Sequence, residues 1–186
     1  MWIEPLLVLC TGLVFGSFVT CASWRLPRDE DVVKKPSYCP SCNTVLGFRD
    51  LWPVVSWVMS KGRCRYCKTK VSARYPLIEI VTALSFLLVY WQYGLTLKAV
   101  LLALLAATLL VMIVADLEHY IIPDQIHLAL LPLGLVYHYE VGTEPMDVAG
   151  GFVLGAAIGL ALHHGYRFLR KKEGLGYGDV KFFAVA

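Results

Sequence analysis

The apolar residues of this chain fall into long blocks separated by polar segments, and they do not recur at the spacing of an amphipathic helix or strand. Five such blocks cover residues 6–22, 77–91, 97–115, 126–139 and 148–166. A membrane-spanning helix needs about 20 predominantly apolar residues, so each block predicts one crossing when its flanking residues are included. A sixth crossing is expected to begin at Val180.

Composition and charge agree with a protein that crosses a membrane several times. Hydrophobic residues make up 58% of the chain and its mean hydropathy is +0.61, values too high for an ordinary soluble domain. If the blocks alternate in direction, the segments 24–76, 116–125 and 167–179 share one side, and 16 of the 17 Lys and Arg lie in or beside them. The positive-inside rule makes this side cytoplasmic.

These patterns predict an all-α polytopic membrane protein with about five to six transmembrane helices and a small cytoplasmic zinc-ribbon-like domain. Residues 1–23 form the first transmembrane helix, because this block lacks the basic n-region and the small-residue cleavage site of a signal peptide. Residues 24–76 form the four-cysteine domain. Residues 77–186 form a transmembrane catalytic bundle, which we expect to be incomplete at its C-terminal end.

Two aspartates, Asp116 and Asp179, stand at the edges of apolar blocks. A carboxylate at that depth is costly, so it indicates a functional site. Two crossings separate the aspartates, so both emerge on the cytoplasmic side. Two carboxyl groups that share a desolvated site titrate in separate steps, and the pair then offers one base and one acid for peptide-bond hydrolysis. We therefore predict that Asp116 and Asp179 form a catalytic pair.

Gly176 and Gly178 come directly before Asp179 in a Gly-Tyr-Gly-Asp run. Glycines let the backbone leave the helical conformation and approach an extended substrate strand closely, so both are expected in an active-site loop. A structural interpretation competes with this one, because an acid at a helix end often caps the helix or lies in headgroup water.

Two further acids are candidates. Asp124 follows Pro123 at the head of an apolar block, which predicts a helix N-cap, and it ranks second to Asp116 as a catalytic residue. Glu79 lies near the start of the second block, and Arg74 is its expected partner.

The polar segment between the first two blocks carries two Cys-x-x-Cys pairs, Cys39 with Cys42 and Cys64 with Cys67. This spacing is typical of zinc ribbons, in which four thiolates hold one tetrahedral metal ion. Two disulfides or a redox-active dithiol are the alternatives. The cytoplasm keeps thiols reduced, which disfavours disulfides, and about fifty residues can build only a small hydrophobic core. A structural zinc ion is therefore expected here.

Glycines with four-residue spacing occur in two of the apolar blocks. Gly12 and Gly16 lie in the first block, and Gly151, Gly155 and Gly159 lie in the fifth. This spacing lets membrane helices pack closely, so we interpret these glycines as helix contacts.

Taken in order, these motifs resemble the type IV prepilin peptidases, which are GxGD-type aspartic proteases of the bacterial inner membrane. The resemblance covers nearly the whole chain. It runs through Gly16-Ser17-Phe18, Arg25-Leu26-Pro27, the four cysteines, Pro53, Ser56, Ser72, Arg74-Tyr75-Pro76, Glu79, Asp116, Pro123-Asp124 and the segment from Gly174 to Lys181.

The resemblance implies an endopeptidase that removes the leader of prepilins and of type II secretion pseudopilins at the cytoplasmic membrane face. It assigns the catalytic acids to Asp116 and Asp179 and zinc to the four cysteines. It also implies that many members methylate the new N-terminus with S-adenosylmethionine, although no glycine-rich nucleotide loop is visible between Trp24 and Tyr75. The expected partners are these substrates and the lipid bilayer, with no nucleic acid.

Two other functions remain open at this point. The Cys-x-x-Cys pairs could serve a membrane thiol oxidoreductase, or the chain could be a non-catalytic, zinc-bearing membrane anchor of a secretion assembly. An oxidoreductase would need its cysteines on the oxidising side of the membrane.

Overall fold

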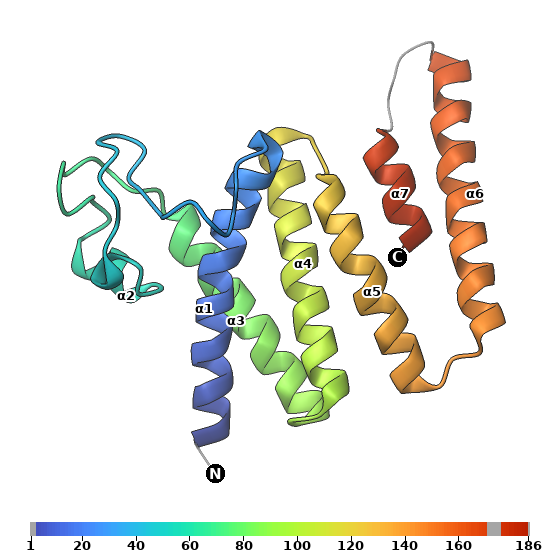
Figure 1. Ribbon diagram of the computed structural model, residues 1–186, viewed down its shortest axis with the longest axis horizontal. Coiled ribbons are helices and arrows are strands. Elements are labelled where there is room, and N and C mark those ends of the chain that lie inside the picture. Colours follow the sequence, from blue (N-terminus) through green and yellow to red (C-terminus); the bar gives the residue numbers. More distant parts are fainter. Residues whose placement is uncertain (1–2, 171–175, 186) are drawn as a thin grey trace.

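The computed structural model describes residues 3–170 and 176–185, so Gly174 and Leu175 of the glycine-rich motif lie outside the described residues. Within these ranges the chain is helical, with two isolated β-bridges and no strand. The helices shown in Figure 1 are α1 (Ile3–Arg25), α2 (Val55–Met59), α3 (Arg74–Tyr93), α4 (Leu97–His119), α5 (Asp124–Val141), α6 (Pro145–Arg170) and α7 (Tyr177–Val185).

Four segments are long and apolar enough to cross a membrane: Ile3–Arg28, Arg74–Tyr93, Leu97–His119 and Pro145–Phe168. The 18-residue helix α5 is not among them, because polar residues stand at both of its ends. It nevertheless carries the chain from the end of α4 to the opposite end, where α6 begins (Figure 1). Since α4 and α6 are both candidate crossings, α5 has to return the chain between them. The arrangement therefore supports the expected fifth crossing.

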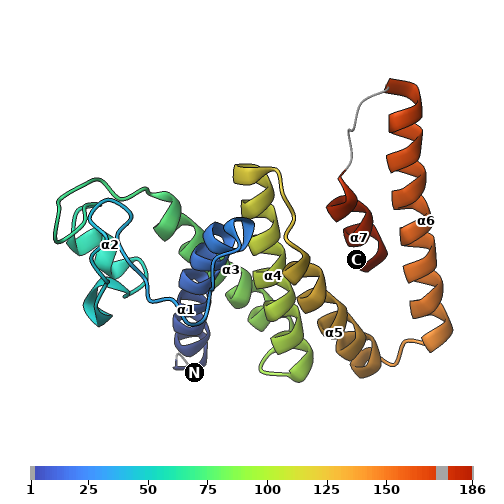
Figure 2. The ribbon, with the colours of Figure 1, turned by 45° about the horizontal axis from the view of Figure 1, so that its top comes forward.

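The described part of α7 has nine residues, too few to cross a bilayer alone. It begins at Tyr177, three residues before the expected start of the sixth apolar stretch at Val180. It runs antiparallel to α6 and packs beside it, as both ribbon views show (Figures 1 and 2).

The helix ends divide into two sets. The C-terminal ends of α1, α4 and α6 and the N-terminal ends of α3, α5 and α7 gather at one end of the molecule (Figure 1). The cysteine segment, residues 26–73, extends sideways from that end beside α1 and α3 (Figure 2). This is the arrangement expected if three polar segments share one face of the membrane.

The glycines of α1 bring it against α3. A Cβ atom at Gly12 would lie 2.6 Å from the Cα of Ala83, and one at Gly16 would lie 2.5 Å from the Cα of Glu79. Both distances are too short for carbon atoms that are not bonded to each other. The predicted role of these two glycines in helix packing is confirmed.

The glycines of α6 have the same role toward α7, with one exception. A Cβ atom at Gly155 would overlap the carbonyl oxygen of Phe183, and one at Gly159 would lie 3.1 Å from the Cα of Val180. Nothing lies within 4 Å of such an atom at Gly151, so the prediction is wrong for that residue. Gly151 lies nearer the start of α6, where the described part of α7 does not reach.

Replacing Gly16 by alanine is expected to lower the thermal unfolding midpoint in detergent. The added methyl group has to push α1 away from α3, and overpacking of this kind costs about 1–3 kcal/mol. Gly134→Ala is the matched control, because nothing lies within 4 Å of a Cβ atom there and alanine is the better residue inside a helix. Equal midpoints for the two variants would contradict the packing argument.

Candidate active site and metal centre

Asp116 lies in the last turn of α4. The helix ends at His119, and the C-cap residue Tyr120 has a left-handed backbone (φ 55°) and donates its N–H to the carbonyl oxygen of Asp116 at 2.8 Å. Asp116 is exposed, and among residues 3–170 and 176–185 no hydrogen bond or ion pair engages its carboxylate. Its side chain is therefore available to a water molecule or a substrate.

Asp179 lies in the first turn of α7. Its Oδ2 accepts the N–H of Gly176 at 2.9 Å, which is the hydrogen bond of an acid that caps a helix N-terminus. A Cβ atom at Gly178 would lie 3.2 Å from the Cβ of Ile122 and 3.4 Å from its carbonyl oxygen. The lack of a side chain at Gly178 thus lets α7 approach the turn between α4 and α5.

Two contacts hold the start of α7 against the start of α5. Nε2 of His127, which is buried, lies 3.0 Å from the carbonyl oxygen of Gly178. Nζ of Lys181 donates to Oδ1 of Asp124 at 2.5 Å. Because α5 follows α4 after a short turn, these contacts tie the glycine-rich run to the end of α4.

The structure therefore places Asp116 and Asp179 on adjoining segments at the same end of the bundle. Their carboxylates make no hydrogen bond to each other. Asp124 is the first residue of α5, and the N-cap is Pro123, so the expectation of a capping role for Asp124 was wrong by one position. Its carboxylate instead pairs with α7.

No role in the site was predicted for His127 or Lys181. His127 belongs to no spacing pattern that marks a site, and Lys181 stood only at the end of the segment from Gly174 that carries the family resemblance. Each acts through a contact between segments more than fifty residues apart. An uncommon residue type inside an apolar block was the only signal for His127.

Glu79 and Arg74 do not pair as expected. Arg74 forms an ion pair with Glu118 of α4 and donates to Oγ of Ser23 at 2.8 Å. Oε2 of Glu79 accepts the backbone N–H of Val54 at 2.6 Å. Val54 has a φ of 59°, which is unusual for a β-branched residue. Glu79 therefore ties a strained turn of the cysteine segment to α3, while Arg74 links α1, α3 and α4.

The four predicted metal ligands, Cys39, Cys42, Cys64 and Cys67, come together. Their sulfur atoms all lie within 4.8 Å of one another, and Sγ of Cys39 lies 3.9 Å from Sγ of Cys67. A tetrahedral zinc ion with Zn–S bonds of ~2.3 Å places its sulfur ligands about 3.8 Å apart. None of the four forms a disulfide. The cluster is thus suited to one metal ion.

Each Cys-x-x-Cys pair has the same local fold. The N–H of Asn43 donates to the carbonyl oxygen of Cys39 at 2.8 Å, and the N–H of Lys68 donates to that of Cys64 at 3.0 Å. Asn43 and Lys68 both have a positive φ, 55° and 60°, so each turn reverses sharply after its second cysteine. The two turns present their thiols to a shared point.

The thiols differ in acidity. Hydrogen bonds from the hydroxyl and the backbone of Thr69 lower the pKa of Cys67 to about 6, whereas burial raises the pKa of Cys39 to about 11. At neutral pH the Cys67 thiol is therefore largely ionised and the Cys39 thiol keeps its proton. A metal ion that binds all four sulfur atoms has to displace that proton.

Comparisons with known proteins match two family models to successive parts of the chain. Residues 10–93 match the family model "Bacterial Peptidase A24 N-terminal domain", a range that covers most of α1, the cysteine segment and α3. Residues 102–186 match "Type IV leader peptidase family", which includes Asp116 and Asp179. No solved structure matches the chain.

Several curated proteins are similar over most of their length. A "Type 4 prepilin-like proteins leader peptide-processing enzyme" of Escherichia coli O78:H11 is 33% identical, over 97% of this chain and 75% of the relative. Proteins named "Prepilin leader peptidase/N-methyltransferase" from Dickeya chrysanthemi and Neisseria gonorrhoeae are 36% and 32% identical, over 100% and 94% of this chain and 73% and 70% of the relatives. The acids, the four-thiol cluster and these matches lead to one conclusion: this multi-pass membrane protein belongs to the type IV leader peptidase family.

Proposed function

We propose that this protein is an aspartic endopeptidase that removes the leader peptide of type IV prepilins and type II secretion pseudopilins, with Asp116 and Asp179 as its catalytic acids. The observation that carries the proposal is their placement on adjoining segments at one end of the bundle, within the region that matches the leader peptidase family. The names of the relatives supply the substrate class.

The proposed chemistry needs one proton on the pair of acids. The ionised aspartate takes a proton from the attacking water, and the protonated one donates to the developing oxyanion or to the leaving amine. Gly176 and Gly178 form the active-site loop, in which the contact of Gly178 with Ile122 holds the chain beside the α4–α5 turn.

The active site and the cysteine segment are proposed to face the cytoplasm from the inner membrane of a bacterium. The Lys and Arg distribution supports this orientation, because 16 of 17 lie in or beside the segments at the end of the bundle that carries the acids. We further propose residues 24–76 as a separate zinc-binding domain and residues 77–186 as the catalytic bundle.

Zinc is the metal we propose for the four-thiol cluster, because thiolate ligands at tetrahedral spacing suit it. S-adenosylmethionine is proposed as the methyl donor of a second activity, since several relatives are named as N-methyltransferases. The thiol oxidoreductase is not favoured, because all four thiols gather at one point as a metal site requires.

The direct test is incubation of the purified full chain with a prepilin in detergent, followed by mass spectrometry of the product. We expect loss of the leader and a new N-terminus. An intact prepilin after prolonged incubation with folded, metal-loaded protein would refute the proposal.

His127→Ala is expected to lower the kcat of leader cleavage by about 10-fold. The variant loses the contact that fixes Gly178 beside the α4–α5 turn, so Asp179 samples more positions and fewer of them are productive. His127→Gln, which can still donate to the Gly178 carbonyl, should recover most of the rate.

The control for this prediction is His138→Ala. His138 bonds to Thr143 at the opposite end of α5, where its loss should leave kcat unchanged. Equal rates for His127→Ala and wild type, measured at saturating substrate, would show that the contact does not position the loop.

A further inference from the structure

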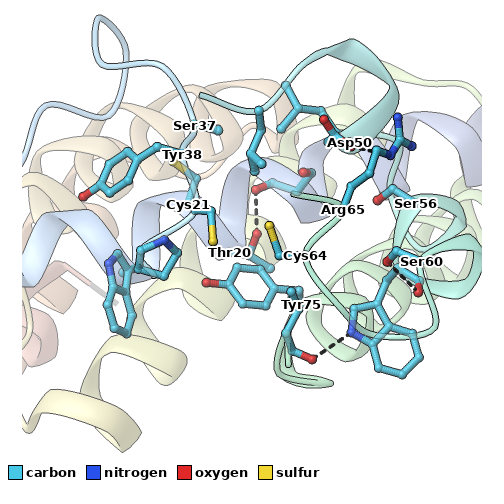
Figure 3. Close-up of a pocket in the computed structure, with 18 of the residues that line it drawn as sticks. Thr20, Cys21, Ser37, Tyr38, Asp50, Ser56, Ser60, Cys64, Arg65 and Tyr75 are labelled. Atoms are coloured by element: carbon cyan, nitrogen blue, oxygen red, sulfur yellow. Dashed lines mark hydrogen bonds and ion pairs between the residues drawn. The ribbon is translucent and has the colours of Figure 1, made fainter. Parts of the chain in front are cut away.

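A second site, separate from the two aspartates, lies between the cysteine segment and the ends of α1 and α3. It is a cavity of about 230 Å³. Figure 3 shows Thr20 and Cys21 of α1, Tyr75 of α3 and Cys64 of the cysteine segment gathered around it. Small-molecule pockets usually measure about 300–1,000 Å³, so this cavity suits the end of a peptide chain better than a whole nucleotide.

The wall of the cavity carries a carboxylate that has no cationic partner. Glu79 is 6% exposed, and its Oε2 accepts the N–H of Val54. Among the described residues no Lys, Arg or His side chain forms an ion pair with it. Burial of an unpaired charge is costly, so Glu79 indicates a ligand that brings the missing positive charge.

Of the four other charged side chains that line the cavity, three are engaged within the protein, and the fourth, Arg63, is exposed. Asp50 pairs with Arg65 at 3.2 Å. The guanidinium of Arg25 donates to three backbone carbonyls, those of Asp31, Lys35 and Pro36. Of the two carboxylates in the lining, Glu79 is therefore the one that has no ion pair among the described residues and can receive a cation.

The remaining walls fit an apolar chain that ends in such a cation. Aromatic rings of Trp24, Tyr38, Trp57 and Tyr75 line the cavity. Ser17 and Thr20 line the cavity on the α1 side, where the Ser17 hydroxyl hydrogen-bonds the Glu79 carboxylate and the Thr20 hydroxyl donates to the carbonyl oxygen of Ser17 at 2.7 Å. An ammonium group at the end of an apolar peptide matches this combination.

We propose that this cavity binds the free amino terminus of the processed peptide, with the Glu79 carboxylate paired to its ammonium group. The inference rests on the proposed function, because leader removal creates that amino terminus. One contact links the cavity to the helix of Asp116: Arg74, the neighbour of the lining residue Tyr75, pairs with Glu118 of α4.

The pairing gives Glu79 a chemical role in N-methylation. An ammonium nitrogen has no lone pair, so it must lose a proton before it can attack a methyl carbon. Glu79 accepts that proton. The freed lone pair would then form the N–C bond as the S–CH3 bond of a sulfonium donor breaks, and the donor would leave as a neutral thioether. Glu79 thus orients the nitrogen and prepares it as a nucleophile.

Binding to the full chain tests this site without cleavage. The probes are a short apolar peptide amide with a free amino terminus and the same peptide acetylated, compared by titration calorimetry. We expect the free peptide to bind at least about 30-fold more tightly to the wild type, because acetylation removes the charge that meets Glu79. Equal affinity of the two peptides would overturn the proposal, and this comparison needs no variant.

Two variants locate the effect. Glu79→Gln keeps the hydrogen bond from Val54 but not the charge, and it should abolish the discrimination between the two peptides. Glu30→Gln removes a partly exposed acid of the cysteine segment that pairs with Lys35 and does not line the cavity, and it should discriminate as the wild type does. Discrimination retained by Glu79→Gln would assign ammonium recognition to another residue and overturn the proposal.

The ratio of methylated to cleaved product gives an independent readout. With a prepilin and S-adenosylmethionine, Glu79→Gln should lower this ratio by about 30-fold or more. An unchanged ratio would refute the role of Glu79 while leader cleavage still stood. Absence of cleavage by the wild type would instead refute the proposed function, and the peptide titration would still decide the cavity.

Discussion

Asp116→Asn and Asp179→Asn are each expected to lower the rate of leader cleavage at least ~1,000-fold, because each removes one half of the acid–base pair. Asparagine has nearly the size of aspartate, but it can neither take a proton from water nor give one to the leaving amine. The measurement is the single-turnover rate of leader release from a prepilin. Thermal unfolding of each variant should match the wild type. The Asp116 carboxylate makes no hydrogen bond or ion pair within residues 3–170 and 176–185, and asparagine can take over the capping hydrogen bond of Asp179.

Asp179 also has an interpretation without catalysis, in which its carboxylate only caps the start of α7, and the Asp179→Asn variant distinguishes the two. Its hydrogen bond to Gly176 would be present in a simple helix cap, and asparagine can replace aspartate in that role. A cap predicts near-normal cleavage by Asp179→Asn, whereas a catalytic acid predicts almost none. The two interpretations therefore differ by orders of magnitude in one experiment.

The same cleavage experiment includes two further Asp-to-Asn variants. Asp147→Asn, in the first turn of α6 at the opposite end of the bundle, is the control and should cleave at the wild-type rate. Asp124→Asn addresses the second-ranked candidate, whose carboxylate already pairs with Lys181. Full activity of Asp116→Asn together with loss in Asp124→Asn would transfer the first catalytic role to Asp124.

The helices could be predicted from the sequence because their signal is local. The block 97–115 became α4, which continues to His119, and the block 148–166 became α6, which begins at Pro145. Hydropathy marks the part of a helix that suits hydrocarbon, whereas helical hydrogen bonding continues into polar residues at the membrane surface. The predicted blocks were therefore short at their ends rather than misplaced.

The cysteine cluster was also predictable, since two tight turns with the same spacing bring four thiols to one point. Partners between distant segments were not. Arg74 has two candidate partners, Glu79 on its own helix α3 and Glu118 on α4. It pairs with Glu118 because of the way α4 packs against α1 and α3, which the sequence does not show. The contacts of His127 and Lys181 with the start of α7 depend in the same way on how α5 lies.

Removal of the metal is expected to unfold the cysteine segment. Binding of a structural zinc ion to small domains contributes about 10–16 kcal/mol, more than the core of so short a segment can replace. After treatment with a strong chelator, backbone amides between residues 26 and 73 should lose their protection from hydrogen exchange, while those of α4 keep theirs. Cys64→Ser should give the same result without a chelator.

Protons compete with the metal ion for the four cysteine sulfur atoms, so the amount of bound metal should depend on pH. Metal binding has to displace the proton of Cys39, whose pKa is about 11, and below pH ~6 it has to displace that of Cys67 as well. The metal content, measured by atomic absorption, should therefore fall as the pH drops from 8 to 5. Cys21→Ser, which alters a cysteine outside the cluster, should retain one metal ion per chain. Full amide protection in metal-free protein would show that packing of the segment against α1 and α3, including the bond from Val54 to Glu79, holds it without zinc.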